Sequence, residues 1–140
     1  AKGTAADWLF SFGPTLQVIV GLHPAAAPAG EAAVAPVERT VFALIDTGAT
    51  LTCIDDALAR DLGLPVIDKQ VSSGIGGKTE LDVYAANIKI PSLGFGQYGR
   101  FAGAKLKEGD QRHEIILGRS LLRDLIMIYD GRTGKVQLVV

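Results

Sequence analysis

The stretch "ALIDTGAT" (residues 43–50) places an ionisable aspartate directly after an apolar run and then turns the chain at a glycine. Burying Asp46 at the end of such a strand is costly unless the charge has a partner or a chemical role. The Asp-Thr-Gly tripeptide alone leaves several interpretations open. The aspartate could cap its own turn, hold the phosphates of a nucleotide, carry a phosphoryl group, or supply half of a catalytic pair.

Chain length and motif context weaken two of these interpretations. Actin-like and sugar-kinase nucleotide sites require two large lobes, and a chain of 140 residues is too short for them. The Asp-Lys-Thr-Gly-Thr pattern of phosphorylated aspartates is not matched around Asp46. The turn cap and the catalytic pair remain, and the rest of the chain has to decide between them.

Composition indicates one ordinary globular domain. Hydrophobic residues make up 48% of the chain and charged residues 21%. The net charge of -1 and the lack of a basic cluster argue against nucleic acid as a partner. No apolar run is long enough to cross a membrane, and no signal peptide is visible. The single cysteine, Cys53, excludes an intrachain disulfide. We therefore favour a cytoplasmic protein, with an upstream anchor or signal left open.

Seventeen glycines, six prolines and many short Val, Ile and Leu runs predict a mostly β protein with frequent turns. Residues 1–14 are expected to form an N-terminal arm whose first three residues resemble a cloning remnant. Residues 15–140 form the main domain, with a flexible Ala/Pro-rich insertion at 23–38. Predicted strands cover 15–22, 40–46, a hairpin over 71–90, both ends of 114–130, and the closing "KVQLVV"; a short helix runs from Asp55 or Asp56 to Arg60.

Two short segments echo one another. "ALIDTGA" and "EIILGRS" each run an apolar strand into a glycine turn that a short helix soon follows. Between them, "SGIGGK" (73–78) forms the glycine-rich tip of the predicted hairpin. Each segment is a modest signal by itself, but the order and spacing of all three are specific.

Together, "LIDTGAT", "SGIGGK" and "IILGRSLL" resemble the retropepsin-like aspartic proteases, the retroviral and single-domain bacterial type. The resemblance extends from about Val18 to Val140. It implies a closed, barrel-like β fold with one or two short helices. It also implies an aspartic endopeptidase that uses no metal and no other cofactor.

The resemblance assigns roles to individual residues. Asp46 is the catalytic acid, and Thr47, Gly48 and Ala49 support its loop. Because the chain holds only one Asp-Thr-Gly, the family pattern implies a homodimer in which two Asp46 carboxylates meet on the axis. The residues implied to form a flap over the bound peptide are Gly74, Ile75, Gly76 and Gly77.

Gly118 and Arg119 match the family position that braces the active-site loop and the dimer. In retroviral enzymes this arginine pairs with an aspartate four residues after the catalytic one, a position that Thr50 occupies here. Asp55, Asp56 and Asp124 are alternative partners among which the sequence does not choose.

Several other features receive simpler interpretations. "GFGQYG" (94–99) satisfies a dinucleotide-binding fingerprint, but no helix pattern follows it, so a loop is favoured. His23 and His113 are expected at the surface and Cys53 in the interior, since their spacing does not suit a metal. The aromatic residues of "DWLFSFG" (7–13) alternate as on one face of a strand. This pattern fits core packing, and we favour over it a subunit contact or a clasp over the body.

The partners expected from the sequence are a peptide or protein substrate and a second copy of the chain, without nucleic acid or membrane. The closing "VQLVV" is a plausible part of the subunit interface because retropepsin termini interleave there. Ile75 and Leu51 are candidates for lining the substrate pocket. The alternative function is a dimer or peptide-binding module that keeps the fold but does not cleave.

Overall fold

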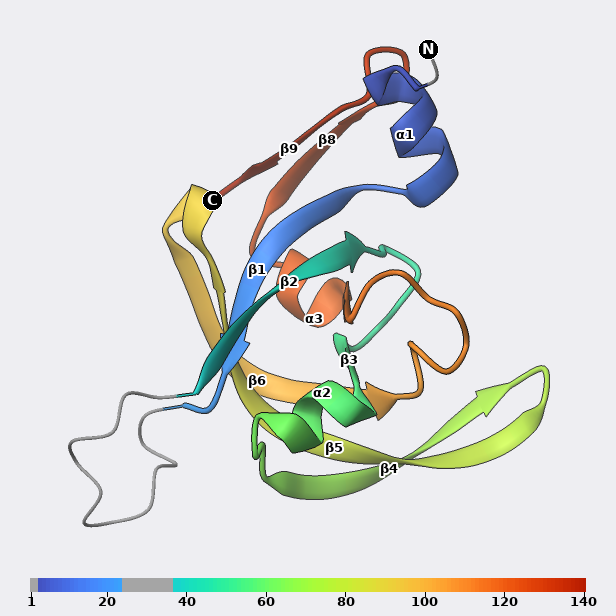
Figure 1. The fold of residues 1–140 in the computed structure, drawn as a ribbon, viewed down its shortest axis with the longest axis vertical. Coiled ribbons are helices and arrows are strands. Elements are labelled where there is room, and N and C mark those ends of the chain that lie inside the picture. The colour runs from blue at the N-terminus through green and yellow to red at the C-terminus, as the bar shows by residue number, and fades with distance from the viewer. Residues whose placement is uncertain (1–2, 24–36) are drawn as a thin grey trace.

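The computed structural model describes residues 3–23 and 37–140 (Figure 1). The predicted insertion at 23–38 falls almost entirely outside this part of the chain. The described helices are α1 (Ala5–Phe12), α2 (Asp56–Asp61) and α3 (Arg119–Leu122), with a 3-10 turn η2 (Pro91–Leu93). The described strands are β1 (Thr15–Gly21), β2 (Glu38–Ile45), β3 (Cys53–Asp55), β4 (Val66–Gly74), β5 (Gly77–Ile90), β6 (Phe95–Ala104), β7 (Ile115–Leu117), β8 (Ile126–Asp130) and β9 (Lys135–Val139).

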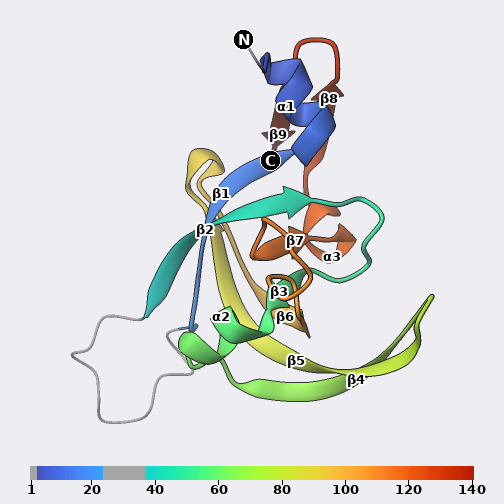
Figure 2. The same cartoon turned by 45° about the vertical axis from the view of Figure 1, so that its right-hand side comes forward.

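Most strands form one sheet that closes on itself. The order is β1-β2-β7-β3-β6-β5-β4, and β1 also pairs with β5 through Ile19↔Lys89 and Val20↔Ile88. This last pairing makes a ring of β1, β2, β7, β3, β6 and β5 and removes its open edges. β4 pairs only with β5, and the two extend beyond the ring as a long hairpin (Figure 2). The predicted mostly β, closed-barrel fold is confirmed.

Alternation along the strands builds the core. Val41, Ala43 and Ile45 of β2 point into the barrel, whereas Phe42 between them is exposed. Val18 and Val20 of β1 are fully buried beside them. Burying such side chains contributes about 1.5–3 kcal/mol each relative to exposure. The alternation therefore fixes which face of β2 is available for function.

The two echoing segments lie side by side. β2 and β7 pair in parallel, with Ala43↔Ile115, Leu44↔Ile116 and Ile45↔Leu117 in register. The backbone N–H of Asp46 continues this ladder by donating to the Leu117 carbonyl at 2.9 Å. The aspartate turn and the Gly118-Arg119 turn therefore leave the barrel at the same end.

The N-terminal arm is a helix, and the predicted strand over 7–13 is wrong. Thr4 caps α1 and forms a capping box with Asp7, because each side chain accepts from the other residue's backbone N–H. Helical spacing brings the rings of Trp8 and Phe12 to 4.8 Å between centroids and buries Leu9, while Phe10 stays 90% exposed. The sequence signal for this helix was the Thr-x-x-Asp box rather than the aromatic alternation.

The predicted loop at "GFGQYG" is also corrected. Only Gly94 precedes the strand. Residues from Phe95 onward belong to β6, which pairs with β5 from Phe95 to Ala102. A strand at this point presents no helix N-terminus to a pyrophosphate. The fingerprint is thus a chance spacing of glycines in a strand.

The helix predicted near Asp55 is confirmed. The Asp55 carboxylate accepts from Leu58 N–H at 3.4 Å and from Lys107 N–H at 3.1 Å, so it caps α2 and holds a distant loop. It is 3% exposed. Asp56 instead accepts a hydrogen bond from the Tyr84 hydroxyl at 3.0 Å.

β8 and β9 form a separate two-stranded sheet, against which α1 lies (Figures 1 and 2). The side chains of Met127, Val136 and Leu138 pack toward the core, whereas Ile126, Ile128 and Val139 are exposed. An isolated hairpin is marginal in water. This terminal hairpin therefore depends on α1 and the barrel on one face and leaves an apolar face uncovered.

Candidate active site

Asp46 stands at the end of β2, where the barrel strand turns into a loop. Its carboxylate oxygen Oδ1 accepts a hydrogen bond from Gly48 N–H at 2.8 Å. No other hydrogen bond to this carboxylate comes from the described part of the chain. Asp46 is half-exposed in the single chain, which corrects the expectation that the strand buries it. Its second carboxylate oxygen, Oδ2, accepts no hydrogen bond from the described residues.

The Asp-Thr-Gly-Ala turn is compact and bonded to itself. Ala49 N–H donates to the Asp46 carbonyl at 3.2 Å, and the Gly48 contact adds a side-chain bond of the kind that aspartate makes in turns. A Cβ at Gly48 would approach Asp46 Oδ1 to 3.1 Å. A turn this tight aims the carboxylate without help from a second chain.

Arg119 braces this loop from α3. Its Nη1 donates to the Thr47 carbonyl at 2.8 Å, and its Nη2 donates to Thr50 Oγ1 at 3.1 Å. Its backbone N–H donates to the Ala49 carbonyl at 2.8 Å. Thr50 therefore takes the place of the retroviral aspartate as a neutral hydrogen-bond acceptor.

The alternative acidic partners of Arg119 are not used. Asp55 and Asp56 are engaged around α2, as described above, and Asp124 accepts from Gln97 Nε2 at 3.3 Å. The brace thus consists of hydrogen bonds to neutral oxygens, without an ion pair. Such bonds fix geometry but add less attraction than a carboxylate partner would.

A buried polar network beneath the loop went unnoticed in the sequence. Gly118 N–H donates to Thr52 Oγ1 at 3.1 Å, and Thr52 N–H donates to Ser120 Oγ at 3.1 Å. The two hydroxyl oxygens are 3.4 Å apart. The only sequence signal was Thr52 in a largely apolar segment, and this pattern is too common to predict a hydrogen-bond network. Ser120 therefore has a structural role here.

Gly118 lets these two segments approach closely. A Cβ at this position would lie 2.5 Å from the Leu51 carbonyl oxygen and 3.0 Å from that of Ala49. Any side chain would thus push α3 away from the Asp46 loop. The structure brings Asp46, Thr47 and Ala49 close to Gly118 and Arg119.

The glycine-rich segment forms the tip of the β4–β5 hairpin. Gly74 pairs with Gly77, leaving Ile75 and Gly76 as the turn, and Gly77 has a φ of 100°. The Ile75 side chain is fully exposed. In both views the tip lies on the same side of the barrel as the loop between β2 and β3 (Figures 1 and 2). The hairpin starts at Val66, earlier than predicted.

The remaining candidate residues lie apart from this chemistry or beside it. Burial, and secondly the charge of Asp46, raise the pKa of the half-buried Cys53 thiol, which disfavours a thiolate. His113 is 5% exposed, so its predicted surface position is wrong. Among the described residues, no three His, Cys, Asp or Glu side chains gather as metal ligands.

Comparison with known proteins identifies the family. The profile of the family described as "Aspartyl protease" matches residues 34–121, which is more than half of the chain and includes the Asp46 loop and Arg119. The chain belongs to the aspartyl protease family. No curated protein sequence matches it.

Solved structures confirm that this aspartyl protease family member has a retropepsin-like fold. The EIAV protease complexed with the inhibitor HBY-793 has a TM-score of 0.53 at 23% identity, covering 79% of this chain and 86% of its own. The simian foamy virus (mac) protease has a TM-score of 0.50 at 20% sequence identity. The match covers 79% of this chain and 92% of that protease. The retroviral protease-like domain of Ddi1 from Leishmania major has a TM-score of 0.47 at 15% sequence identity. The match covers 71% of this chain and 79% of that domain.

The described helices do not include one that combines enough length and apolar character to span a bilayer. The longest, α1, has only eight residues.

Proposed function

We propose that this protein is an aspartic endopeptidase that acts as a homodimer through a pair of Asp46 carboxylates. The observation that supports this most directly is the half-exposed Asp46 carboxylate at the end of β2, held by Gly48 N–H. The loop that carries it is braced by Arg119 and by the buried Thr52 network. A preorganised carboxylate open to one side is what a shared catalytic site requires.

Two copies are needed because one chain supplies only one such acid. The second glycine turn reads Leu117-Gly118-Arg119, and it bonds to the Asp46 loop without contributing a carboxylate. A twofold axis beside the loop would set two Asp46 residues against each other. The half-exposure of Asp46 in the single chain fits a site that only a second subunit would close.

The chemistry follows from two close carboxylates. Because like charges this near cannot both ionise easily, the pair holds one proton and titrates as a unit. The ionised member takes a proton from a water molecule, which attacks the peptide carbonyl, and the protonated member donates to the carbonyl oxygen. Cleavage should therefore be favoured at mildly acidic pH.

The β4–β5 hairpin suits a flap. Its tip is glycine-rich and carries Ile75 fully exposed, while its base is part of the barrel through the pairing of β5 with β6. An extended peptide would lie between the tip and the Asp46 loop and bond through its main chain. Leu51, which is partly buried beside the loop, is a candidate for contacting apolar substrate side chains.

Replacement of Asp46 tests the proposal. We expect Asp46→Asn to abolish cleavage of a broad peptide library between pH 4 and 8, because the amide cannot act as the base. The matched control is Asp61→Asn, which removes an exposed carboxylate that lies 3.8 Å from Arg39. Undiminished cleavage by purified Asp46→Asn would contradict the proposal.

The second candidate function is a peptide-binding or assembly dimer that does not cleave. The neutral contact of Arg119 with Thr50 favours it, because a weaker brace suits a loosely held pair. Sedimentation of wild-type protein beside the library digest separates the two. Dimers without cleavage at any pH would support binding alone, and a strict monomer without cleavage would contradict the proposed dyad.

A further inference from the structure

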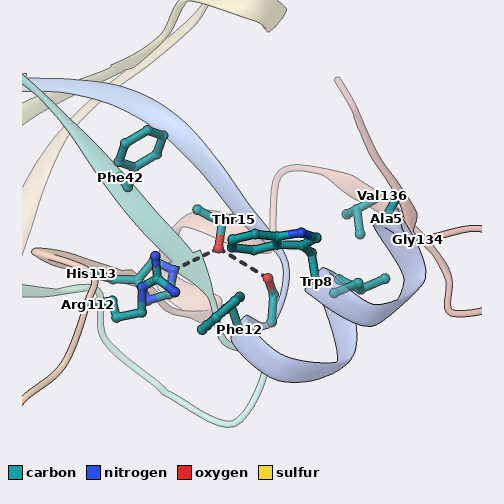
Figure 3. Close-up of a pocket in the computed structure, with 11 residues that line it drawn as sticks. Ala5, Trp8, Phe12, Thr15, Phe42, Arg112, His113, Gly134 and Val136 are labelled. Atoms are coloured by element: carbon teal, nitrogen blue, oxygen red, sulfur yellow. Dashed lines mark hydrogen bonds between the residues drawn. The ribbon is translucent and has the colours of Figure 1, made fainter. Parts of the chain in front are cut away.

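A pocket of about 560 Å³ lies outside the barrel, between α1, the start of β1 and the segment before β7 (Figure 3). Its size falls in the range of small-molecule sites. Figure 3 shows Trp8 and Phe12 on the α1 side and Phe42 coming from β2. The other residues that the argument uses are Thr15, Arg112 and His113.

The walls are mainly aromatic. Trp8 and Phe12 lie one helical turn apart with centroids 4.8 Å apart at an angle of 40°, and Phe42 projects from the outer face of β2. Phe42 and Trp8 both remain more than half exposed although they flank a concave surface. Flat apolar walls of this kind favour an aromatic body.

The neutral polar groups of the pocket are already paired. Thr15 Oγ1 lies 2.7 Å from His113 Nε2 and donates to the Gly13 carbonyl at 3.1 Å, and His113 Nδ1 lies 3.0 Å from Gln111 Oε1. Burial, and secondly Arg112, lower the pKa of His113, which favours the neutral form of the ring. These groups shape the pocket but do not demand a ligand.

Arg112 differs from them. Its exposed guanidinium lies over the Phe12 ring with the Cζ atom 3.9 Å from the centroid, which is a cation–π contact within the pocket lining. Within residues 3–23 and 37–140, no carboxylate forms an ion pair with it, and the lining residues include no acid. None of its N–H donors is hydrogen-bonded within the described residues, so they are available to a ligand in the pocket that Arg112 lines. A guanidinium matches the two oxygens of a carboxylate.

We propose that this pocket binds a small aromatic carboxylate, with the ring among Trp8, Phe12 and Phe42 and the carboxylate on Arg112. The site is separate from the Asp46 loop and does not depend on peptide cleavage. The stacking of Arg112 on Phe12 preorganises the cation, so binding requires little reordering of its side chain.

The chain carries its own reporter, because Trp8 is its single tryptophan. Titration with 4-phenylbutyrate, excited at a wavelength that only tryptophan absorbs, should give a saturable change in Trp8 emission. The uncharged 4-phenyl-1-butanol and the cationic 4-phenylbutylamine should bind at least tenfold more weakly. Decanoate, which keeps the carboxylate but lacks a ring, should also bind more weakly.

Variants separate the charge from the fold. Arg112→Gln should weaken binding of 4-phenylbutyrate about tenfold and leave the alcohol unaffected, while Arg112→Lys should retain more of the affinity. Arg123→Gln, which removes an exposed arginine beyond α3, is the matched control and should bind as wild type does. If Arg112→Gln fails to fold, the ranking of the probes on wild-type protein decides the proposal by itself.

Two results would overturn the proposal. Equal affinity for the alcohol and the carboxylate would remove the role of Arg112. A Trp8 emission that changes with protein concentration but with none of the probes would show that a second copy of the chain occupies the pocket instead. Neither measurement depends on catalytic activity, so failure of this proposal would not contradict the proposed protease function.

Discussion

Two threonines beside the Asp46 loop make similar hydrogen bonds in different surroundings. Thr50 Oγ1 accepts from Arg119 at the surface, whereas Thr52 Oγ1 accepts from Gly118 N–H and is only 2% exposed. Water can replace the bond at Thr50 but cannot reach Gly118 N–H. An unpaired buried donor costs about 1–3 kcal/mol, more than the net loss of an exposed bond.

We therefore expect Thr52→Val to lower the free energy of unfolding by about 1–3 kcal/mol. Thr50→Val, its matched control, should cost less than about 1 kcal/mol because its partner stays hydrated. Urea unfolding of both variants checks the difference. Equal costs would contradict the inference that burial decides the strength of this network.

His113 makes stability depend on pH. Its pKa lies below the usual value of about 6.5 because of burial and Arg112, so the unfolded chain binds the proton first as pH falls. The free energy of unfolding should therefore decrease as pH falls from about 6.5 through the lowered pKa of the folded state.

The change in unfolding free energy between pH 7.5 and 5.0 measures this contribution. It should be smaller in His113→Gln than in wild type, although the variant also loses the contact with Thr15. If the change in unfolding free energy between pH 7.5 and 5.0 is the same in His113→Gln as in wild type, the pH dependence comes from other groups.

At the scale of elements, α1 depends on one turn of the terminal hairpin. Gly134, which ends the turn between β8 and β9, has a φ of 78°, and any Cβ there would collide with the Ala5 backbone. The helix is too short to persist alone in water. Its position, and with it one wall of the pocket, follows from this close contact.

We expect Gly134→Ala to lower the free energy of unfolding by about 1–3 kcal/mol, because both the backbone strain and the collision oppose docking of α1. Trp8 emission should shift to longer wavelength as the helix leaves the hairpin. Gly99→Ala in β6 is the control, since a Cβ there meets nothing within 4 Å. A wild-type spectrum for Gly134→Ala would refute the contact.

At the scale of the whole molecule, the barrel leaves two features incomplete. The Asp46 carboxylate opens outward, and the β8–β9 hairpin exposes an apolar face formed by Ile126, Ile128 and Val139. Both are consistent with the proposed dimer, in which the terminal strands would lie at the interface. A charge placed on this face should oppose association.

We expect Ile128→Lys to weaken self-association at least tenfold in sedimentation, since truncating or charging a central apolar contact commonly costs more than about 1.4 kcal/mol. Ile67→Lys is the matched control: it lies on β4, away from this hairpin, and is similarly exposed at 48% against 50% for Ile128. Identical association of Ile128→Lys and wild type would place the interface elsewhere.

The sequence by itself predicted a mostly β chain and the order of its motifs. The closed barrel and the contact of Arg119 with the Asp46 loop followed from the resemblance that these motifs carry. Strand alternation and glycine turns are local signals, so they can be found in the residues themselves. The N-terminal helix was missed because the aromatic spacing of "DWLFSF" also fits a strand. The Thr-x-x-Asp capping box indicated the helix, and docking on Gly134 positions it.

Tertiary structure alone decided the contacts between distant segments. The choice of Thr50 over three acidic residues, the burial of His113, the Thr52–Ser120 network and the pocket at Arg112 each join residues dozens of positions apart. Such contacts depend on where the closed barrel brings its loops. Local secondary-structure propensity does not predict these contacts, because the free energy that stabilises them comes from apolar burial across the whole barrel.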